Sequence, residues 1–183
     1  MATTTRRTPT PVVVAALAVG AVAFVAIVLT LYLAIEAAYV TVHVVGVSMS
    51  PTLKPGDYAL ARKTHGGPVS RGEIVVIRDP YDPRKDLIKR VVALPGERLG
   101  IAAGVVSING SRLNEPYLNP EPWTVNSTWP AGAKDYLMPR DSYFVMGDNR
   151  NHSSDSTTYG PISSGMIEAV VFERVWPAPG PVR

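Results

Sequence analysis

The feature that most constrains this chain is a long apolar segment near its N-terminus. Residues 12–35 read VVVAALAVGAVAFVAIVLTLYLAI, which is 24 residues without a charge. At ~1.5 Å of rise per residue, a helix of this length exceeds the ~30 Å hydrocarbon core of a bilayer. A cleavable signal peptide would have an apolar region of only about 7–15 residues before a small-residue cleavage site. We therefore predict an uncleaved transmembrane anchor over residues 12–38.

The charges that flank the apolar segment predict its orientation. Arg6 and Arg7 precede it without any acidic residue, and the first acidic residue is Glu36. Basic residues favour the cytoplasmic side of a membrane-spanning helix. The sequence therefore predicts a single-pass protein of the cell membrane, with a Thr- and Pro-rich cytoplasmic tail (residues 1–11) and an extracytoplasmic domain (residues 39–183).

Composition excludes several classes of function. The chain has no cysteine, which rules out thiol nucleophiles, disulfides and cysteine-based zinc sites. Its three histidines, His43, His65 and His152, do not have the HExxH spacing of zinc proteases, so we expect no metal site. A net charge of +3 without a long basic block makes nucleic acid a poor candidate partner.

The part of the chain that follows the anchor has the pattern of an all-β fold. Short runs rich in Val, Ile and Tyr are separated by turn residues, and the chain holds 17 prolines and 15 glycines. None of these runs is followed by a long amphipathic helical pattern, so we expect largely antiparallel pairing. The expected strands cover residues 38–45, 57–63, 73–79, 86–94, 98–101, 104–108, 142–147 and 166–176.

One hairpin and one insertion are expected within this β domain. Asn109 and Gly110 separate two alternating runs, and both residue types tolerate the positive φ angles of a type I′ turn. Residues 114–139 are dense in proline, include two tryptophans and show little periodicity. We therefore predict a small β and loop subdomain inserted at about residues 96–140.

A short stretch that closely follows the anchor, GVSMSPTLKPGD, makes Ser48 a candidate nucleophile. A serine hydroxyl is a weak nucleophile until a neighbouring base takes its proton. A solvated or structural role suits each of the three histidines better than a place in a catalytic triad. Lysine can serve as the base, provided that burial lowers its pKa from ~10.4 towards neutrality.

The run DLIKRVVAL offers such a lysine. Period-2 alternation places Lys89 on one face of the expected strand, with residues 87, 91 and 93, and Arg90 on the other face, with residues 88, 92 and 94. Lysine can lose its proton when it is buried, whereas arginine effectively cannot. Lys89 is therefore the candidate base and Arg90 an expected ion-pair residue, with an ordinary lysine on an edge strand as the alternative.

A polar run, VMGDNRNHSSDS, directly follows an apolar strand at residues 145–156. It superficially resembles a calcium loop, but Arg150 and Ser153 occupy the third and sixth positions, where an EF-hand needs Asp or Asn and then Gly. The metal interpretation fails for this reason. A turn rich in side-chain hydrogen bonds and the wall of a catalytic site both remain open.

Taken in order behind an anchor, the motifs SMSPTLKPGD, RGEIVVIRDP, LIKRVVALPGE and MGDNRNHSSDS resemble the bacterial type I signal peptidases, also called leader peptidases. The resemblance runs from the anchor to about Gly160. It implies that Ser48 is the nucleophile and Lys89 the general base of a Ser-Lys dyad. Such an enzyme removes signal peptides from exported preproteins through an acyl-enzyme, without a metal or an organic cofactor.

The resemblance also implies roles for the polar run. Ser153 would hold the Lys89 ammonium by a hydrogen bond, and Asp148 would pair with Arg90. Arg150 and Asp155 would make structural ion pairs and hydrogen bonds. The run departs from the commonest family pattern at Asn151, His152 and Thr157, and the last departure leaves the usual arginine partner of Asp155 missing.

For the substrate, the resemblance implies an added strand with shallow apolar pockets for small side chains at the first and third positions before the cut. The Ser48 backbone N–H would stabilise the oxyanion, and Gly46 occupies the position where some members supply a serine hydroxyl. Twelve residues separate Ser48 from Ile35 and span at most about 43 Å, so the site would lie near the membrane surface. The expected pocket walls are Met49, Leu53, Val44, Val45, Leu87 and Ile88.

The expected partners are signal peptides of exported preproteins and the lipid bilayer, and two other interpretations compete with this one. A Ser-Lys self-cleaving protease of the repressor type would carry a DNA-binding or partner domain in place of the anchor. A membrane-anchored β domain for protein interaction would need neither the serine nor the lysine. Cleavage of a peptide that ends in Ala-x-Ala would distinguish an enzyme from an interaction domain.

Overall fold

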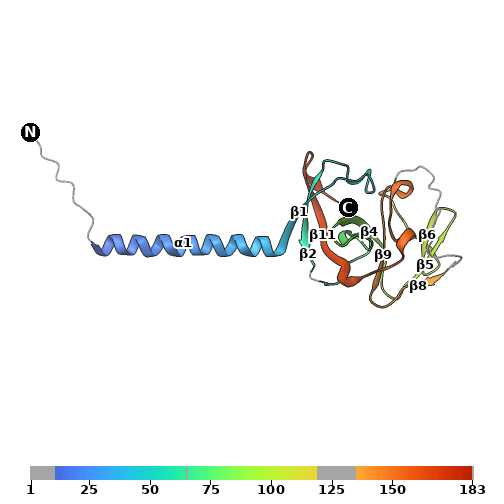
Figure 1. Cartoon of the computed structure of the whole chain (residues 1–183), viewed down its shortest axis with the longest axis horizontal. Helices are drawn as coiled ribbons and strands as arrows, with labels where there is room; N and C mark the ends of the chain where they lie inside the picture. Colours follow the sequence, from blue (N-terminus) through green and yellow to red (C-terminus); the bar gives the residue numbers. More distant parts are fainter. Residues whose placement is uncertain (1–10, 65, 119–134, 183) are drawn as a thin grey trace, which may run out of the picture. The chain divides into compact units, whose positions relative to one another are not determined.

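Figure 1 shows the computed structural model of the chain, which describes residues 11–64, 66–118 and 135–182. The predictions made for the tail at residues 1–10, for His65 and for residues 119–134 lie outside these described residues. The chain divides into two compact units, Met1–Ala38 and Tyr39–Arg183. The division into tail, anchor and catalytic domain with an insertion stays a prediction.

The first unit contains one long helix, α1, which spans Pro11–Ala38. Its 28 residues correspond to about 42 Å of helix, and none of them is buried within the chain. A helix that is apolar on all sides and uncovered by its own protein has the length and composition of a membrane span. The prediction of a long apolar N-terminal helix is therefore confirmed.

The second unit is built mainly from one antiparallel sheet in the strand order β1-β2-β11-β3-β4-β9-β10, with β12 paired to β11. Each observed pairing is antiparallel, which confirms the all-β prediction. The strands are β1 (Tyr39–His43), β2 (Tyr58–Lys63), β3 (Ile74–Arg78), β4 (Asp86–Ala93), β9 (Ser142–Met146), β10 (Ile162–Ser163), β11 (Ile167–Trp176) and β12 (Gly180–Pro181). The short helices are η1 (Arg150–His152), α2 (Ser156–Tyr159) and η2 (Ser164–Met166).

A second, four-stranded sheet has the order β7-β6-β5-β8. Asn109 and Gly110 have φ angles of 51° and 80°, and they join β6 to β7 as the predicted tight turn requires. Positive φ at both central positions explains why an Asn-Gly pair stands here. The strands of this sheet are β5 (Arg98–Ala102), β6 (Val105–Ile108), β7 (Ser111–Arg112) and β8 (Tyr136–Leu137).

Strand β4 lies between β3 and β9 in the sheet order, but the part of it that carries Lys89 borders only β3 among the described strands, so strand position alone does not decide against an ordinary edge-strand lysine. It pairs with β3 from Asp86 to Arg90, but β9 pairs with it only from Arg90 onward. Among the described residues, 86–89 are therefore hydrogen-bonded to a strand on one side only. This leaves a length of strand edge available for a further strand.

The core explains why β3 and β4 read as continuous apolar runs. Side chains of β3 alternate between two buried clusters, one containing Val76 and the other containing Val75. The predicted alternation on β4 fails after Val91, because a register shift lies between Val91 and Ala93. As a result Val92 and Ala93 both join a third cluster, against the small sheet.

Candidate active site

Ser48 lies in a tight turn that follows β1 and is held by its apolar neighbours. Within the turn, the Ser50 N–H donates to the Val47 carbonyl at 3.1 Å and the Leu53 N–H donates to the Met49 carbonyl at 2.9 Å. Met49 and Leu53 are fully buried in the cluster that contains Val76. Burial of two side chains within five residues fixes the backbone of the turn and, with it, the position of Ser48.

Lys89 meets Ser48 from β4. Its Nζ lies 3.0 Å from the Ser48 Oγ and 3.0 Å from the Ile88 carbonyl oxygen, and only 2% of Lys89 is exposed. Among the described residues, no carboxylate forms an ion pair with this ammonium. Burial lowers the pKa of Lys89, and the more distant charges of Asp155 and Asp79 offset only part of that effect.

The two histidines that the structure describes, His43 and His152, contact residues other than Ser48. The His43 ring stacks on the Tyr58 ring with centroids 4.5 Å apart. The His152 Nδ1 lies 3.2 Å from the Asn149 Oδ1 at an exposed position. The only described base in hydrogen-bond contact with the Ser48 Oγ is therefore Lys89.

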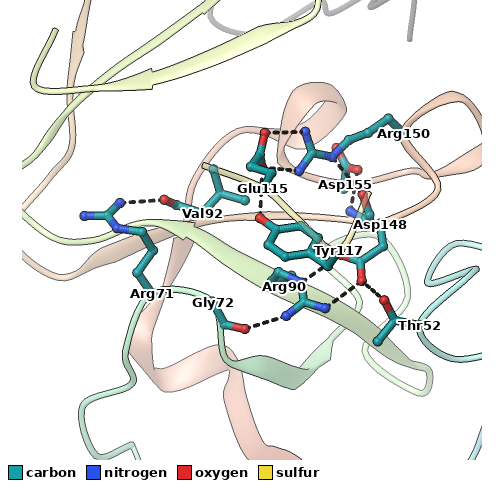
Figure 2. A network of polar contacts seen from close by, with 11 residues as sticks. Thr52, Arg71, Gly72, Arg90, Val92, Glu115, Tyr117, Asp148, Arg150 and Asp155 are labelled. Atoms are coloured by element: carbon teal, nitrogen blue, oxygen red, sulfur yellow. Dashed lines mark hydrogen bonds and ion pairs between the residues drawn. The ribbon is translucent and has the colours of Figure 1, made fainter. Parts of the chain in front are cut away.

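Arg90 occupies the other face of β4 and makes a fully buried bidentate pair with Asp148 (Figure 2). Its Nε and Nη2 lie 2.8 and 2.7 Å from the two carboxylate oxygens, and its Nη1 donates to the Gly72 carbonyl at 2.7 Å. The Thr52 hydroxyl adds a hydrogen bond to Asp148 at 2.5 Å. A charge pair so deeply buried is tolerable because nearly every polar atom in it has a partner.

The polar run that follows β9 wraps the Ser48 turn. The Asn149 N–H donates to the Ser48 carbonyl at 2.9 Å, and the Asn149 side-chain amide donates to the Val47 carbonyl at 3.2 Å. Gly147 permits this approach, because a Cβ there would collide with the Ser48 carbonyl and with Ser153. The sequence prediction did not assign a role to Gly147, although a glycine between an apolar strand and a polar run was a usable signal.

Asp155 is bound by Thr157, the residue that stands where the commonest family pattern has an arginine. Its carboxylate accepts hydrogen bonds from the Thr157 N–H at 3.0 Å and the Thr157 hydroxyl at 2.7 Å, which caps α2. The other carboxylate oxygen accepts from the Gly147 N–H at 2.9 Å. Thr157 therefore supplies a local partner, and Asp155 ties α2 to the loop that holds Ser48.

Ser153 does not bind Lys89 in this structure, contrary to the expectation from the resemblance. Its buried Oγ has no hydrogen-bond partner among the described residues. The hydroxyl faces the space beside Gly147 and the Ser48 carbonyl, while Lys89 Nζ is bonded to the Ser48 Oγ and the Ile88 carbonyl. The Ser153 side chain is packed against Gly147 instead, where only the absence of a Cβ leaves room for it.

A cleft of about 700 Å³ opens beside Ser48 and Lys89. Of the six expected wall residues, Leu53 is the exception, because it is a core residue with no exposed surface and does not line the cleft. The expected walls that do line it are Val44, Val45, Met49, Leu87 and Ile88, together with Gly46. Gly46 has free space around it, since a Cβ there would meet nothing within 4 Å.

Several residues of the cleft were not predicted. The apolar ones belong to β1, β3 and β11, whose alternating apolar pattern looks the same for core and for cleft. A charged rim also escaped prediction, because isolated charges at strand ends carry no distinctive signal. The unpredicted lining residues include Val40, Val42, Val76, Ile167, Ala169, Lys63, Arg78, Asp86 and Glu168.

The described residues contain no cluster of three or more His, Asp or Glu side chains arranged to hold a metal ion. The groups gathered next to Ser48 are its hydroxyl, the buried amine of Lys89 and apolar walls. This set suits nucleophilic attack on a carbonyl with proton transfer through the amine.

Comparison with known proteins shows which family the chain is similar to. Residues 16–176 match the family model described as "Signal peptidase, peptidase S26". Signal peptidase I of Bacillus caldolyticus is 33% identical over 162 residues, covering 84% of this chain and 86% of the relative. Signal peptidase IB of Staphylococcus aureus is 32% identical over 147 residues, covering 72% of this chain and 75% of the relative.

A solved structure was also matched. The crystal structure of a signal peptidase I from Enterococcus faecalis V583 is 28% identical in sequence to this chain, with a TM-score of 0.47. The match covers 56% of this chain and 96% of the crystallised one.

Proposed function

This chain belongs to the signal peptidase family, peptidase S26, and from that premise we propose that it is a membrane-anchored serine endopeptidase that removes signal peptides from exported preproteins by a Ser-Lys dyad. The observation that carries the proposal is the 3.0 Å contact between the Ser48 Oγ and the Nζ of a buried Lys89. A lysine whose pKa is lowered by burial can be neutral when it meets the serine, and only the neutral amine can accept a proton.

In the proposed mechanism, neutral Lys89 accepts the Ser48 hydroxyl proton as the Oγ attacks the scissile carbonyl carbon. The tetrahedral oxyanion is stabilised by the Ser48 backbone N–H, a kind of contact whose loss costs ~2.7–4 kcal/mol in other enzymes. The C–N bond then breaks as the Lys89 ammonium gives its proton to the leaving amine. An ester of Ser48 remains, and water deprotonated by Lys89 hydrolyses it and regenerates the serine.

The substrate would bind as an extended strand beside residues 86–89, which pair with no other described strand on the side away from β3. Small side chains at the first and third positions before the cut would face the apolar walls near Ser48. Alternate residues of a strand point the same way, which explains why two positions separated by one residue are read together.

The anchor and the location are part of the proposal. Helix α1 would span the cell membrane with the N-terminal tail in the cytoplasm, as the placement of Arg6 and Arg7 favours. The β domain would then face outward, where the cleavage region of a membrane-inserted signal peptide emerges. The bilayer is thus a partner of the enzyme as well as of its substrate.

The test is cleavage of a preprotein with an Ala-x-Ala site by the full chain in detergent or vesicles. Ser48→Ala and Lys89→Ala should each reduce cleavage by at least about 10³-fold while the protein stays folded. Ser50→Ala is the matched control and should cleave like the wild type. Substantial cleavage by either dyad variant would overturn the dyad, and no cleavage by the wild type would favour the interaction-domain alternative.

A further inference from the structure

A short segment, residues 114–118, contacts Arg150 in the polar run that follows β9 (Figure 2). Within this segment, which we call the strap, the Glu115 carboxylate binds the Arg150 guanidinium through both Nη atoms, one of them at 3.2 Å. The Tyr117 hydroxyl donates to the same carboxylate at 2.9 Å. The Tyr117 ring lies 3.9 Å from the Cζ of Arg90.

The pair between the strap and the polar run is nearly as buried as the Arg90 pair. The side chains of Arg150 and Glu115 are only 3% and 10% exposed. A guanidinium cannot lose its proton, so removal of its carboxylate would leave a buried charge without compensation. The cation–π contact with the Tyr117 ring gives the Arg90 guanidinium a second favourable electrostatic partner besides Asp148.

A continuous set of contacts leads from the strap to the nucleophile. The Arg150 Nε donates to the Gly147 carbonyl at 3.1 Å, so that Glu115 and Gly147 hold the same guanidinium. Two residues beyond Gly147, the Asn149 N–H holds the Ser48 carbonyl. On the other side, Tyr117 covers Arg90, the neighbour of Lys89 on β4.

We propose that Glu115 and Tyr117 are positioning residues for the Ser48–Lys89 dyad, acting through Arg150 and Arg90. The inference rests on the proposed function and gives the strap a role in that same reaction. Neither residue lines the cleft, so neither is expected to contact the substrate. Burial and the nearby Glu115 raise the pKa of Tyr117, which keeps its phenol protonated as a donor to that carboxylate.

Loss of a positioning residue should lower kcat and leave KM unchanged, because the geometry of attack changes while the walls of the cleft do not. Glu115→Gln keeps the shape of the side chain and removes only its charge. We expect it to lower kcat about tenfold, the equivalent of one weakened charged hydrogen bond. Tyr117→Phe keeps the ring on Arg90, removes the hydrogen bond to Glu115, and should lower kcat by a smaller factor.

A second ion pair, which is less buried than the strap pair and, among the described residues, shares no hydrogen bond or ion pair with the strap or with Ser48, provides the control for a purely structural role. Glu97 pairs with Arg71 and also accepts from the Leu94 N–H at 2.7 Å, with the paired side chains 17% and 27% exposed. Glu97→Gln should lower the unfolding midpoint in urea without changing kcat. If Glu115 only stabilised the fold, Glu97→Gln and Glu115→Gln should change kcat in the same way.

The experiment measures kcat, KM, their pH dependence and the urea midpoint for the wild type, Glu115→Gln, Tyr117→Phe and Glu97→Gln as full chains in detergent. Lower kcat at constant KM in both strap variants, with an unchanged pH midpoint and normal kcat for Glu97→Gln, supports the inference. Normal kcat in both strap variants, or an equal loss in Glu97→Gln, overturns it. Wild-type cleavage that Ser48→Ala abolishes shows that the proposed function stands whichever result the strap gives.

Discussion

Lys89 and Arg90 are neighbours on β4 and are almost equally buried, with 2% and 1% of their surface exposed, yet the structure surrounds them in opposite ways. Arg90 is held by both oxygens of Asp148, by the Gly72 carbonyl and by the Tyr117 ring. Lys89 is given a hydroxyl and a carbonyl and, among the described residues, no paired carboxylate. Arg90 is paired with a carboxylate, whereas burial lowers the pKa of Lys89 and so favours its neutral form.

The difference teaches how a single strand can carry both a structural charge and a chemical one. Burial without a carboxylate favours the neutral amine, which is a base. Burial with a bidentate carboxylate favours the ion pair, which is rigid and unreactive. Substitutions that break the Arg90–Asp148 pair should therefore act mainly on stability, and substitutions of Lys89 itself should act on the rate of cleavage.

The largest expected effect comes from Lys89→Arg, which keeps a long cationic side chain but removes the ability to lose a proton. Cleavage of an Ala-x-Ala preprotein should fall by at least about 10³-fold. The measurement is single-turnover cleavage, with circular dichroism to show that the sheet is intact. A folded Lys89→Arg protein that cleaves at near the wild-type rate would break the comparison.

The next effect is on stability and concerns Asp148→Asn, which leaves the Arg90 guanidinium buried without a charge partner. The free energy of unfolding should fall by about 3–5 kcal/mol. The double change Arg90→Met with Asp148→Leu should lose much less, because no unpaired charge remains. Urea denaturation of the full chain in detergent measures both, and an Asp148→Asn loss no larger than that of the double variant would contradict the account.

A smaller loss of stability is expected for Thr52→Val, which removes the hydroxyl bonded to Asp148 and keeps the shape of the side chain. The unfolding free energy should fall by about 1–3 kcal/mol, as for one hydrogen bond to a charged group. The value of kcat should not change, since Thr52 serves the structural side. A fall in kcat with normal stability would contradict the purely structural role of the hydrogen bond between Thr52 and Asp148.

The smallest effect is expected for Gly46→Ser, which, in contrast to Thr52→Val, should change kcat and leave stability the same. Free space surrounds Gly46 at the edge of the cleft, so a hydroxyl can be accommodated there. A second oxyanion donor should raise kcat by up to about tenfold, less than the ~10²–10³ that loss of a preorganised donor costs elsewhere. Stability should stay the same, and Gly46→Ala is the matched control. A kcat for the serine variant no higher than that of the alanine variant would refute a donor role at this position.

Much of this arrangement could be predicted from sequence. Uninterrupted apolar residues predicted α1, and an Asn-Gly pair predicted the β6–β7 turn, because each depends on local composition alone. Alternation on β4 predicted opposite neighbours for Lys89 and Arg90, since the side-chain period of a strand is two. The alternation failed after Val91, because a register shift lies between Val91 and Ala93 and the local sequence carries no signal for it.

What sequence could not supply were contacts between distant segments. The bond expected from Ser153 to Lys89 is absent in the described structure because the Ser153 side chain faces Gly147. Leu53, expected in the cleft, has the same apolar character as Met49, and only the packing of the turn separates core from wall. Glu115 and Arg150 lie 35 residues apart in the chain, and no periodicity links them.

The most direct test of the central claim is the pH dependence of kcat/KM for wild-type cleavage of one Ala-x-Ala preprotein. Lys89 must be deprotonated to accept the Ser48 proton, so the rate should rise with pH and reach a plateau above the pKa of Lys89 in the free enzyme. Because burial lowers that pKa, the midpoint of the rise should lie clearly below the ordinary lysine value of 10.5. A rate that is still rising through pH 10.5 would show an unperturbed lysine and would contradict the account.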